Sequence, residues 1–270
     1  MGLFVDIHKR MGKFSLDVSL ETCGWVTGLL GASGSGKSMT LKCIAGIEKP
    51  DRGQIILDGV TLFDSSRRIN LTPQERKVGY LFQNYSLFPN MTVKQNILCG
   101  LRGRGKSGGE PDSAEGRERK LSEIIEMMQL RGLEKRKPHQ LSGGQQQRVA
   151  MARIMIGNPK IIMLDEPFSS LDSYLRGKLQ VRMRELLTNF GKDVLMVTHS
   201  RGEAYRMCRR IALIDGGGII AYDDTKEIFA DPGSIQAAII TGCKNIVEAR
   251  KSGEYEAEVP KWGVDRKSVV

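Results

Sequence analysis

The sequence has no apolar run long enough to cross a membrane, because none of its stretches approaches the ~18–20 residues that a spanning helix needs. Residues 1–14 alternate apolar and charged side chains and lack the apolar segment of a signal peptide. The 5 cysteines form no CxxC pair, which argues against a disulfide framework or a zinc ribbon. We therefore expect a soluble protein of a reducing compartment.

Positive charge and glycine are both abundant. The 270 residues include 41 Lys and Arg against 31 Asp and Glu, a net charge of +10. This excess favours a polyanionic partner, which can be a nucleotide, a nucleic acid or an anionic membrane surface. There are 31 glycines, well above the usual share of ~7%. The length fits one large domain or two modest ones.

Apolar runs alternate with helical patterns along most of the chain. Residues 3–7 and 14–20 alternate in period two around a turn at 11–13, which predicts paired antiparallel strands. Further strands are expected at 25–30, 54–57, 78–82, 161–164, 194–198 and 210–214, with an antiparallel return strand at 219–222. The runs at 161–164, 194–198 and 210–214 are apolar throughout and are separated by helical patterns. Such runs are typical of a parallel sheet covered on both faces. The sequence therefore predicts an α/β fold.

One internal region differs from this pattern. Residues 90–140 have no strand pattern, and helices are expected at 93–98 and 113–129. We interpret residues 84–158 as containing a helical subdomain inserted into the α/β domain, with a polar, glycine-rich flexible loop at 100–116. The basic side chains of this loop are expected to form a solvated tip. The charged tail at 244–270 is only weakly patterned.

Residues 31–38, GASGSGKS, match the GxxxxGK[ST] pattern between a predicted strand and a predicted helix. A triphosphate needs many donors at once, which a closely wrapped glycine loop and a helix N-terminus supply. We call residues 31–38 the phosphate loop. Lys37 would reach the β- and γ-phosphates, and the Ser38 hydroxyl would ligate Mg²⁺. The nucleotide-binding candidates are Gly31, Ala32, Ser33, Gly34, Ser35, Gly36, Lys37, Ser38 and Met39.

Two carboxylates, Asp165 and Glu166, end the apolar run at 161–164. Ligands of parallel sheets lie beyond the carboxyl ends of the strands. Asp165 is therefore placed to hold Mg²⁺ through a water, and Glu166 to orient or deprotonate an attacking water. Read alone, the pair fits two solvated acids at a strand end equally well. The phosphate loop favours the catalytic interpretation.

A second glycine cluster, LSGGQ at 141–145, precedes a helical pattern at 146–156. Small residues at a helix N-terminus form a further anion site in principle, although one triphosphate is already held by the phosphate loop. The alternative is an ordinary helix with Ser142 as its N-cap. We call residues 141–145 the signature segment. Together with GASGSGKS and with IIMLDEP at 161–167, it gives the chain a close resemblance to the ATPase subunit of ABC transporters, over residues 1–243.

This resemblance implies a phosphate-binding-loop NTPase (ABC ATPase) core with a mostly parallel sheet, an N-terminal antiparallel β region and an inserted helical subdomain. It also implies further roles. Gln83 matches a glutamine that ligates Mg²⁺, Asp172 matches the residue that couples two sites, and His199 matches the histidine that contacts the γ-phosphate. The catalytic candidates are then Glu166, His199 and Gln83, and the metal candidates are Ser38, Gln83 and Asp165.

In the family that the chain resembles, two ATPase chains close head to tail around ATP. The resemblance therefore implies a homodimer in which Ser142, Gly143, Gly144 and Gln145 of one chain complete the nucleotide site of the other, with Asp172 beside them. The implied cofactors are ATP and Mg²⁺. The implied partners are integral membrane permease subunits and, indirectly, a substrate-binding protein, with no nucleic acid. The expected place is the cytoplasmic face of the cell membrane.

Two positions depart from the family pattern. Ser200 stands where the family usually has an acid after the histidine, outside the core chemistry. The family also stacks adenine on an aromatic residue near the first hairpin. Phe14 is the nearest candidate for that role, and its alternation fits a core strand equally well.

A single helical subdomain with no fused membrane domain resembles the importer branch. This resemblance implies that Leu87, Phe88 and Pro89 are exposed at an interface with the membrane subunit. The alternative is that these residues pack within an ordinary loop. The finer likeness is to molybdate importers, with sulfate and other small-solute importers as alternatives. Longer relatives carry a C-terminal β domain, of which residues 244–270 would be a start or a remnant. Soluble ABC ATPases that act on nucleic acid or ribosomes are a different class, but they usually carry two cassettes. A small-molecule kinase or switch protein would have no use for LSGGQ.

Overall fold

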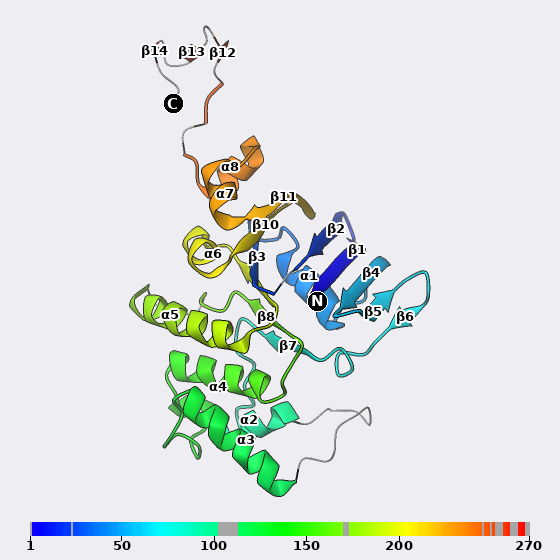
Figure 1. The fold of residues 1–270 in the computed structure, drawn as a ribbon, viewed down its shortest axis with the longest axis vertical. Coiled ribbons are helices and arrows are strands. Elements are labelled where there is room, and N and C mark those ends of the chain that lie inside the picture. Colours follow the sequence, from blue (N-terminus) through cyan, green and yellow to red (C-terminus); the bar gives the residue numbers. More distant parts are fainter. Residues whose placement is uncertain are drawn as a thin grey trace.

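The computed structural model describes residues 2–22, 24–101, 113–169, 173–244, 246–248, 250–251, 256–259 and 264–267. Eleven strands form one mixed sheet in the order β6-β5-β4-β1-β2-β11-β10-β3-β9-β8-β7 (Figure 1). Their bounds are β1 Leu3–Met11, β2 Phe14–Glu21, β3 Val26–Leu30, β4 Arg52–Leu57, β5 Val60–Asp64, β6 Ile69–Asn70, β7 Val78–Leu81, β8 Ile161–Asp165, β9 Val194–Thr198, β10 Arg210–Asp215 and β11 Gly218–Asp224.

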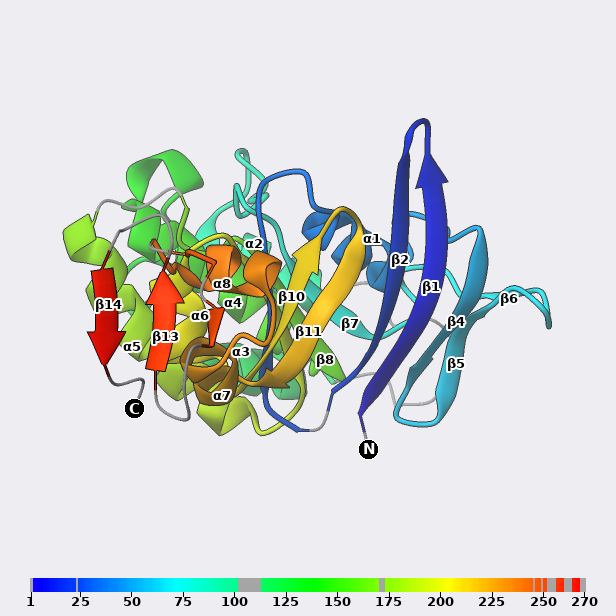
Figure 2. The same ribbon diagram turned by 90° about the horizontal axis from the view of Figure 1, so that it is seen from above.

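The predicted parallel core is confirmed. Strands β10, β3, β9, β8 and β7 are parallel neighbours, and β8 and β9 are buried along their whole length. The predicted antiparallel region, β1 with β2, is continuous with this core rather than separate from it, because β11 joins β2 to β10. Figure 2 shows the antiparallel strands at one end of the molecule and helices α3 to α6 at the other. Strands β5 and β6 were not predicted.

The helices and 3-10 turns fill the connections between strands. Their bounds are α1 Lys37–Ala45, α2 Val93–Leu98, η1 Cys99–Leu101, α3 Ala114–Met127, η2 Pro138–Gln140, α4 Gly143–Met155, α5 Ser173–Phe190, α6 Arg201–Met207, α7 Thr225–Ala230 and α8 Ile235–Thr241. The described part of 90–140 is helical, as predicted. The expected loop at 100–116 falls largely outside the described residues, and its ends belong to η1 and α3.

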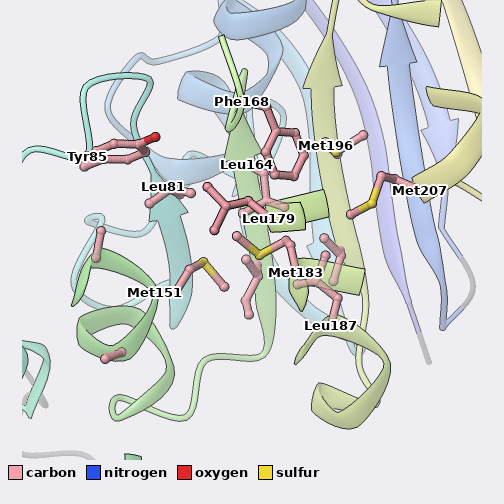
Figure 3. Packing of buried hydrophobic residues seen from close by; sticks show 14 of the residues in the cluster. Leu81, Tyr85, Met151, Leu164, Phe168, Leu179, Met183, Leu187, Met196 and Met207 are labelled. Atoms are coloured by element: carbon pink, nitrogen blue, oxygen red, sulfur yellow. The ribbon is translucent and has the colours of Figure 1, made fainter. Parts of the chain in front are cut away.

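Two apolar clusters lie on the two faces of the sheet. Because side chains alternate along a strand, Ile161 and Met163 of β8 belong to one cluster, and Ile162 and Leu164 belong to the other. The second cluster is covered by α4 and α5, whose Met151 and Leu179 belong to it, with Leu179 beside Leu164 (Figure 3). Apolar packing on both faces thus holds the sheet in place, and with it the strand ends from which the loops at the carboxyl edge begin.

A buried arginine fixes helix α1, which carries the phosphate loop at its N-terminus. Arg76 is 1% exposed, and its Nη1 donates to the carbonyl oxygens of Cys43 and Ile44, at 2.8 Å each. A cation at a helix C-terminus satisfies carbonyls that have no partner within the helix. The same guanidinium donates to Asn70 Oδ1 at 2.8 Å, so it ties α1 to β6.

The tail contains a small antiparallel sheet of β12 Arg250–Lys251, β13 Glu256–Val259 and β14 Val264–Lys267. The weak pattern alone predicts no strands here, whereas the family resemblance suggests the start or remnant of a C-terminal β domain. In the described ranges, no helix is both long and apolar enough to cross a membrane.

Candidate functional site

The phosphate loop joins β3 to α1 and needs glycine at two positions for different reasons. A Cβ at Gly31 would lie 2.2 Å from the backbone oxygen of Ile214, so only glycine fits beside β10. Gly36 has φ 102, in the left-handed region, and a Cβ there would lie 2.5 Å from Leu16. The neighbouring strands therefore hold the loop in its curved form.

The N-terminus of α1 points its free amides into this loop. Among the described side chains, none caps the helix at Gly36, so its first amides are available to an anion. Lys37 lies at the same point, is only 4% exposed, and donates from Nζ to the Ala32 oxygen at 2.6 Å. Burial lowers the Lys37 pKa, while the carboxylates of Glu166 and Asp165 act in the opposite direction. The loop thus holds a buried cation next to unpaired helix amides.

The Ser38 hydroxyl and the Asp165 carboxylate meet across the sheet edge. Ser38 Oγ donates to Asp165 Oδ1 at 2.7 Å, and the Tyr80 hydroxyl donates to Asp165 Oδ2 at 2.8 Å. Hydroxyl and carboxylate oxygens are the ligands that Mg²⁺ prefers, with substrate phosphates and waters completing its shell. The described residues form no group of three or more His, Cys, Asp or Glu that could hold a metal alone. This donor set therefore fits a magnesium ion shared with a bound phosphate.

Tyr80 was missed by the sequence reasoning. Its signal is a single phenol within the apolar strand β7, which pairs in parallel with β8. Burial and the adjacent Asp165 carboxylate raise the Tyr80 pKa, so the phenol stays protonated and donates.

The variant Tyr80→Phe is expected to lower the Tm by about 5 °C, because it removes a hydrogen bond to a charged group worth roughly 1.5–3 kcal/mol. Thermal unfolding of the nucleotide-free protein measures this. The matched control is Tyr222→Phe. The Tyr222 hydroxyl donates to the uncharged backbone carbonyl oxygen of Glu21 at an exposed position. Equal shifts in the two variants would show that Tyr80 does not hold Asp165.

Glu166 and His199 lie side by side at the ends of β8 and β9. His199 Nδ1 lies 3.1 Å from Glu166 Oε1, with the two side chains 58% and 21% exposed. Glu166 has φ 47, a strained backbone state for a side chain of this size, and its amide donates to the Val197 oxygen at 3.0 Å. The fold thus keeps a strained carboxylate beside an imidazole at the edge where the phosphate loop lies.

Gln83 lies near this pair but does not touch the Ser38–Asp165 contact in any described hydrogen bond. Its Nε2 donates to Ser169 Oγ at 3.3 Å, and that hydroxyl donates to the backbone carbonyl oxygen of Glu166 at 3.0 Å. Ser169 is a second residue that sequence reasoning missed. Ser200 caps α6, since its Oγ accepts from the Glu203 amide at 3.4 Å.

The signature segment lies apart from the phosphate loop in the same chain, with α1 and α4 in different regions of Figure 1. Ser142 is an N-cap in a capping box with Gln145, so helix α4 begins at Gly143 rather than at the predicted 146. The alternative interpretation of Ser142 as a cap is therefore correct as a local structure, and the cap satisfies the Gln145 amide within the chain. Gln147, 1% exposed, donates to the Pro167 oxygen at 3.0 Å and links α4 to the residue after Glu166.

The remaining candidates are Asp172, Phe14 and the segment 87–89, and the structure places them differently. Asp172 lies outside the described residues. Phe14 is half-buried next to the phosphate loop, with its Cζ 3.3 Å from the Cβ position of Gly36. Phe88 and Pro89 are exposed as expected, whereas Leu87 is half-buried and packs against the core.

The model of one protein family matches residues 15–169 and is described as "ABC transporter". The chain belongs to the ABC transporter family. The molybdenum import ATP-binding protein ModC of Paramagnetospirillum magneticum is 37% identical over 86% of this chain and 61% of its own length. The sulfate/thiosulfate import ATP-binding protein CysA 1 of Agrobacterium fabrum is 44% identical over 84% of this chain and 64% of its own length. The chain thus spans about three-fifths of these curated relatives.

Solved structures of ABC cassettes share the fold. A dimeric post-hydrolysis state of the ATP-binding cassette MJ0796 bound to ADP and Pi aligns with TM-score 0.67 and 30% identity, over 83% of this chain and 99% of that one. The cassette MJ1267 aligns with TM-score 0.72 and 28% identity, over 87% and 97%. The α/β ABC ATPase fold expected from the sequence is therefore confirmed.

Proposed function

We propose that this chain is the ATP-hydrolysing subunit of an ABC importer. The observation that carries the proposal is the convergence of three groups at one sheet edge: Lys37 in the phosphate loop, the Ser38–Asp165 contact, and the Glu166–His199 pair. Binding ATP needs the first two, and activating a water needs the last. The names of the relatives, which include importers of molybdenum, sulfate and putrescine, support the importer class.

In the proposed reaction, Lys37 and the loop amides bind the phosphates of ATP. Ser38, Asp165 and Gln83 would hold Mg²⁺, which would supply neutralisation of charge on the phosphate oxygens. Glu166 accepts a proton from a water whose oxygen attacks the γ-phosphorus, and His199 contacts the γ-phosphate. The bond from the γ-phosphorus to the β–γ bridging oxygen breaks, and its electron pair leaves with ADP. The products are ADP and inorganic phosphate.

The proposed active unit is a homodimer that closes head to tail around ATP. Within one chain the signature segment lies apart from the phosphate loop, so the N-terminus of α4, with its dipole and its Gly143 and Gly144, would serve a nucleotide held by a second copy. Ser142, Gly143, Gly144 and Gln145 would then complete the partner's site, with Asp172 beside them. The dimeric MJ0796 cassette supports this arrangement. Phe14 beside the phosphate loop is proposed to stack on adenine.

Residues 1–243 are proposed as the ABC ATPase domain, and residues 244–270 as the start of a further β unit. The small sheet β12–β14 supports that division. The proposed place is the cytoplasmic face of the cell membrane, bound to integral permease subunits that receive a solute from a substrate-binding protein.

Molybdate is the proposed solute, with sulfate as the alternative. The likeness that suggested molybdate lies in segments such as 43–48 and 241–245, and a molybdenum importer is among the relatives. Sulfate importers match at 42–44% identity, compared with 37% for the molybdenum importer.

The experiment that tests this function is purification of the full chain from native membranes, followed by reconstitution in vesicles. We expect an integral permease to co-purify, and ATP hydrolysis to rise severalfold when molybdate and its binding protein are added. Stimulation by sulfate alone would favour the sulfate alternative. Recovery only with ribosomes or nucleic acid would contradict the importer class.

A further inference from the structure

A cavity of about 470 Å³ lies between helices α5 and α6, outside the site described above. None of its lining residues belongs to the phosphate loop, the signature segment or the Glu166–His199 pair. Residues 177, 180, 181 and 184 of α5 recur at three- and four-residue spacing, so they lie on one helix face. That face is next to the stripe of Leu179, Met183 and Leu187, which packs into the core (Figure 3).

Positive charge surrounds this cavity. Arg176 and Arg184 of α5 and Arg206 of α6 line it, and among the described lining residues there is no carboxylate. Within the described residues, neither Arg184 nor Arg206 forms an ion pair with Asp or Glu. The guanidinium groups of Arg184 and Arg206 suit phosphate and carboxylate, because their planar donors match those anions.

A buried amide with an open donor lies in the same wall. Gln180 is 3% exposed, and its Oε1 accepts from Arg206 Nε at 3.1 Å. Its Nε2 is buried and has no hydrogen-bond partner in the described part of the chain. Leaving a buried donor unpaired costs roughly 1–3 kcal/mol. A ligand oxygen in the cavity would supply the missing acceptor.

Gly177 gives a third, independent indication. It lies inside helix α5, where glycine costs roughly 1 kcal/mol relative to alanine. A Cβ at this position would meet no atom within 4 Å, so packing does not require glycine there. What the missing side chain does provide is open space in the cavity wall.

We propose that the cavity between α5 and α6 is a second anion site, which binds a small molecule carrying two or more negative charges. Its oxygens would accept from Arg184, Arg206 and Gln180 Nε2. Val181 and Met207 provide apolar surface for the uncharged part of the ligand. Helix α6 begins two residues after His199, so a ligand that bridges α5 and α6 would also stiffen the segment that carries this histidine.

The test is titration calorimetry at fixed ionic strength with two probes, inorganic pyrophosphate and citrate. They distinguish a phosphate ligand from a carboxylate ligand. All proteins carry Lys37→Ala, which weakens anion binding at the phosphate loop. We expect one binding event for at least one probe. The double variant Arg184→Gln, Arg206→Gln should weaken it by about tenfold or more, through lost charge-assisted bonds.

Arg182→Gln is the control, because it removes one positive charge from the helix that carries Arg184, at a residue that lines a different hollow. It should change the affinity by less than twofold. Gly177→Leu, which fills the cavity, should abolish binding while the thermal unfolding transition persists. The proposal is overturned if neither probe binds, or if Arg182→Gln weakens binding as much as the double variant, since that would indicate unspecific attraction to a basic surface.

Discussion

Replacing Glu166 by glutamine is expected to lower the rate of ATP hydrolysis by at least about 100-fold, because general bases contribute ~10²–10⁴-fold. The amide keeps the size of the side chain, so the left-handed backbone at φ 47 and the hydrogen bond to the Val197 oxygen remain. It cannot accept the proton of the attacking water. The chemical step should therefore fail while ATP binding persists.

The same variant should accumulate as a dimer when ATP and Mg²⁺ are present. In the proposed reaction the closed dimer opens once ATP has been cleaved, so a protein that binds but does not cleave stays closed. Phosphate release measures the first effect, and size-exclusion chromatography with and without ATP measures the second. A monomer at all ATP concentrations would contradict the head-to-tail dimer, whatever the hydrolysis rate.

The control for this prediction is Glu126→Gln. Glu126 also pairs with a basic side chain, since its Oε2 lies 3.1 Å from Arg131 Nη2, but both groups are about 70% exposed on the surface. Exposed pairs of this kind contribute ~0–1 kcal/mol. We expect wild-type hydrolysis for Glu126→Gln, which would assign the loss in Glu166→Gln to its position and not to the loss of a carboxylate.

The variant Lys37→Ala is expected to weaken ATP binding by about tenfold to more than a hundredfold, the equivalent of one charge-assisted hydrogen bond to a phosphate. Lys37 is only 4% exposed, so its ammonium group has lost most of its contact with water, and this burial lowers its pKa. A desolvated cation gains more from a phosphate than a surface lysine does. Fluorescence titration with a labelled ATP analogue measures the change.

Stability should respond differently from binding. Lys37→Ala removes a buried charge together with its bond to the Ala32 oxygen, so the two effects oppose each other, and the Tm without nucleotide should shift little. Lys42→Ala is the matched control, because it removes a cation from the last turn of the same helix. It should leave ATP affinity within about threefold. Unchanged ATP affinity in Lys37→Ala would mean that the phosphate loop does not bind the triphosphate.

The parts of the site that could be predicted from the sequence are those fixed by neighbours along the chain. The phosphate loop is a local pattern, and Asp165 and Glu166 directly follow an apolar run whose end marks the sheet edge. Tyr80 and Ser169 could not be found in this way. Tyr80 reaches Asp165 through the parallel register of β7 with β8, which no local pattern specifies.

The fold shows the same division. Long alternating or continuous apolar runs predicted β1, β2, β3, β8 and β9 within a few residues. The short strand β5 pairs with β4 through an irregular register between Ile55 and Ile56, and this irregularity breaks the alternation that would have marked it. Arg76 is the clearest exception to composition rules, since a charged side chain in the core is intelligible only from the carbonyls that surround it.

The position of β3 in the sheet has a consequence for the order of assembly during synthesis. Its two neighbours, β9 and β10, lie roughly 160 or more residues further along the chain. At ~5–20 residues per second, the ribosome delivers them some ten to thirty seconds after β3. Until then the strand that leads into the phosphate loop has neither flanking strand, and Gly31 has no β10 to lie against. The nascent chain therefore becomes able to hold a nucleotide only once the residues of β10 have been made.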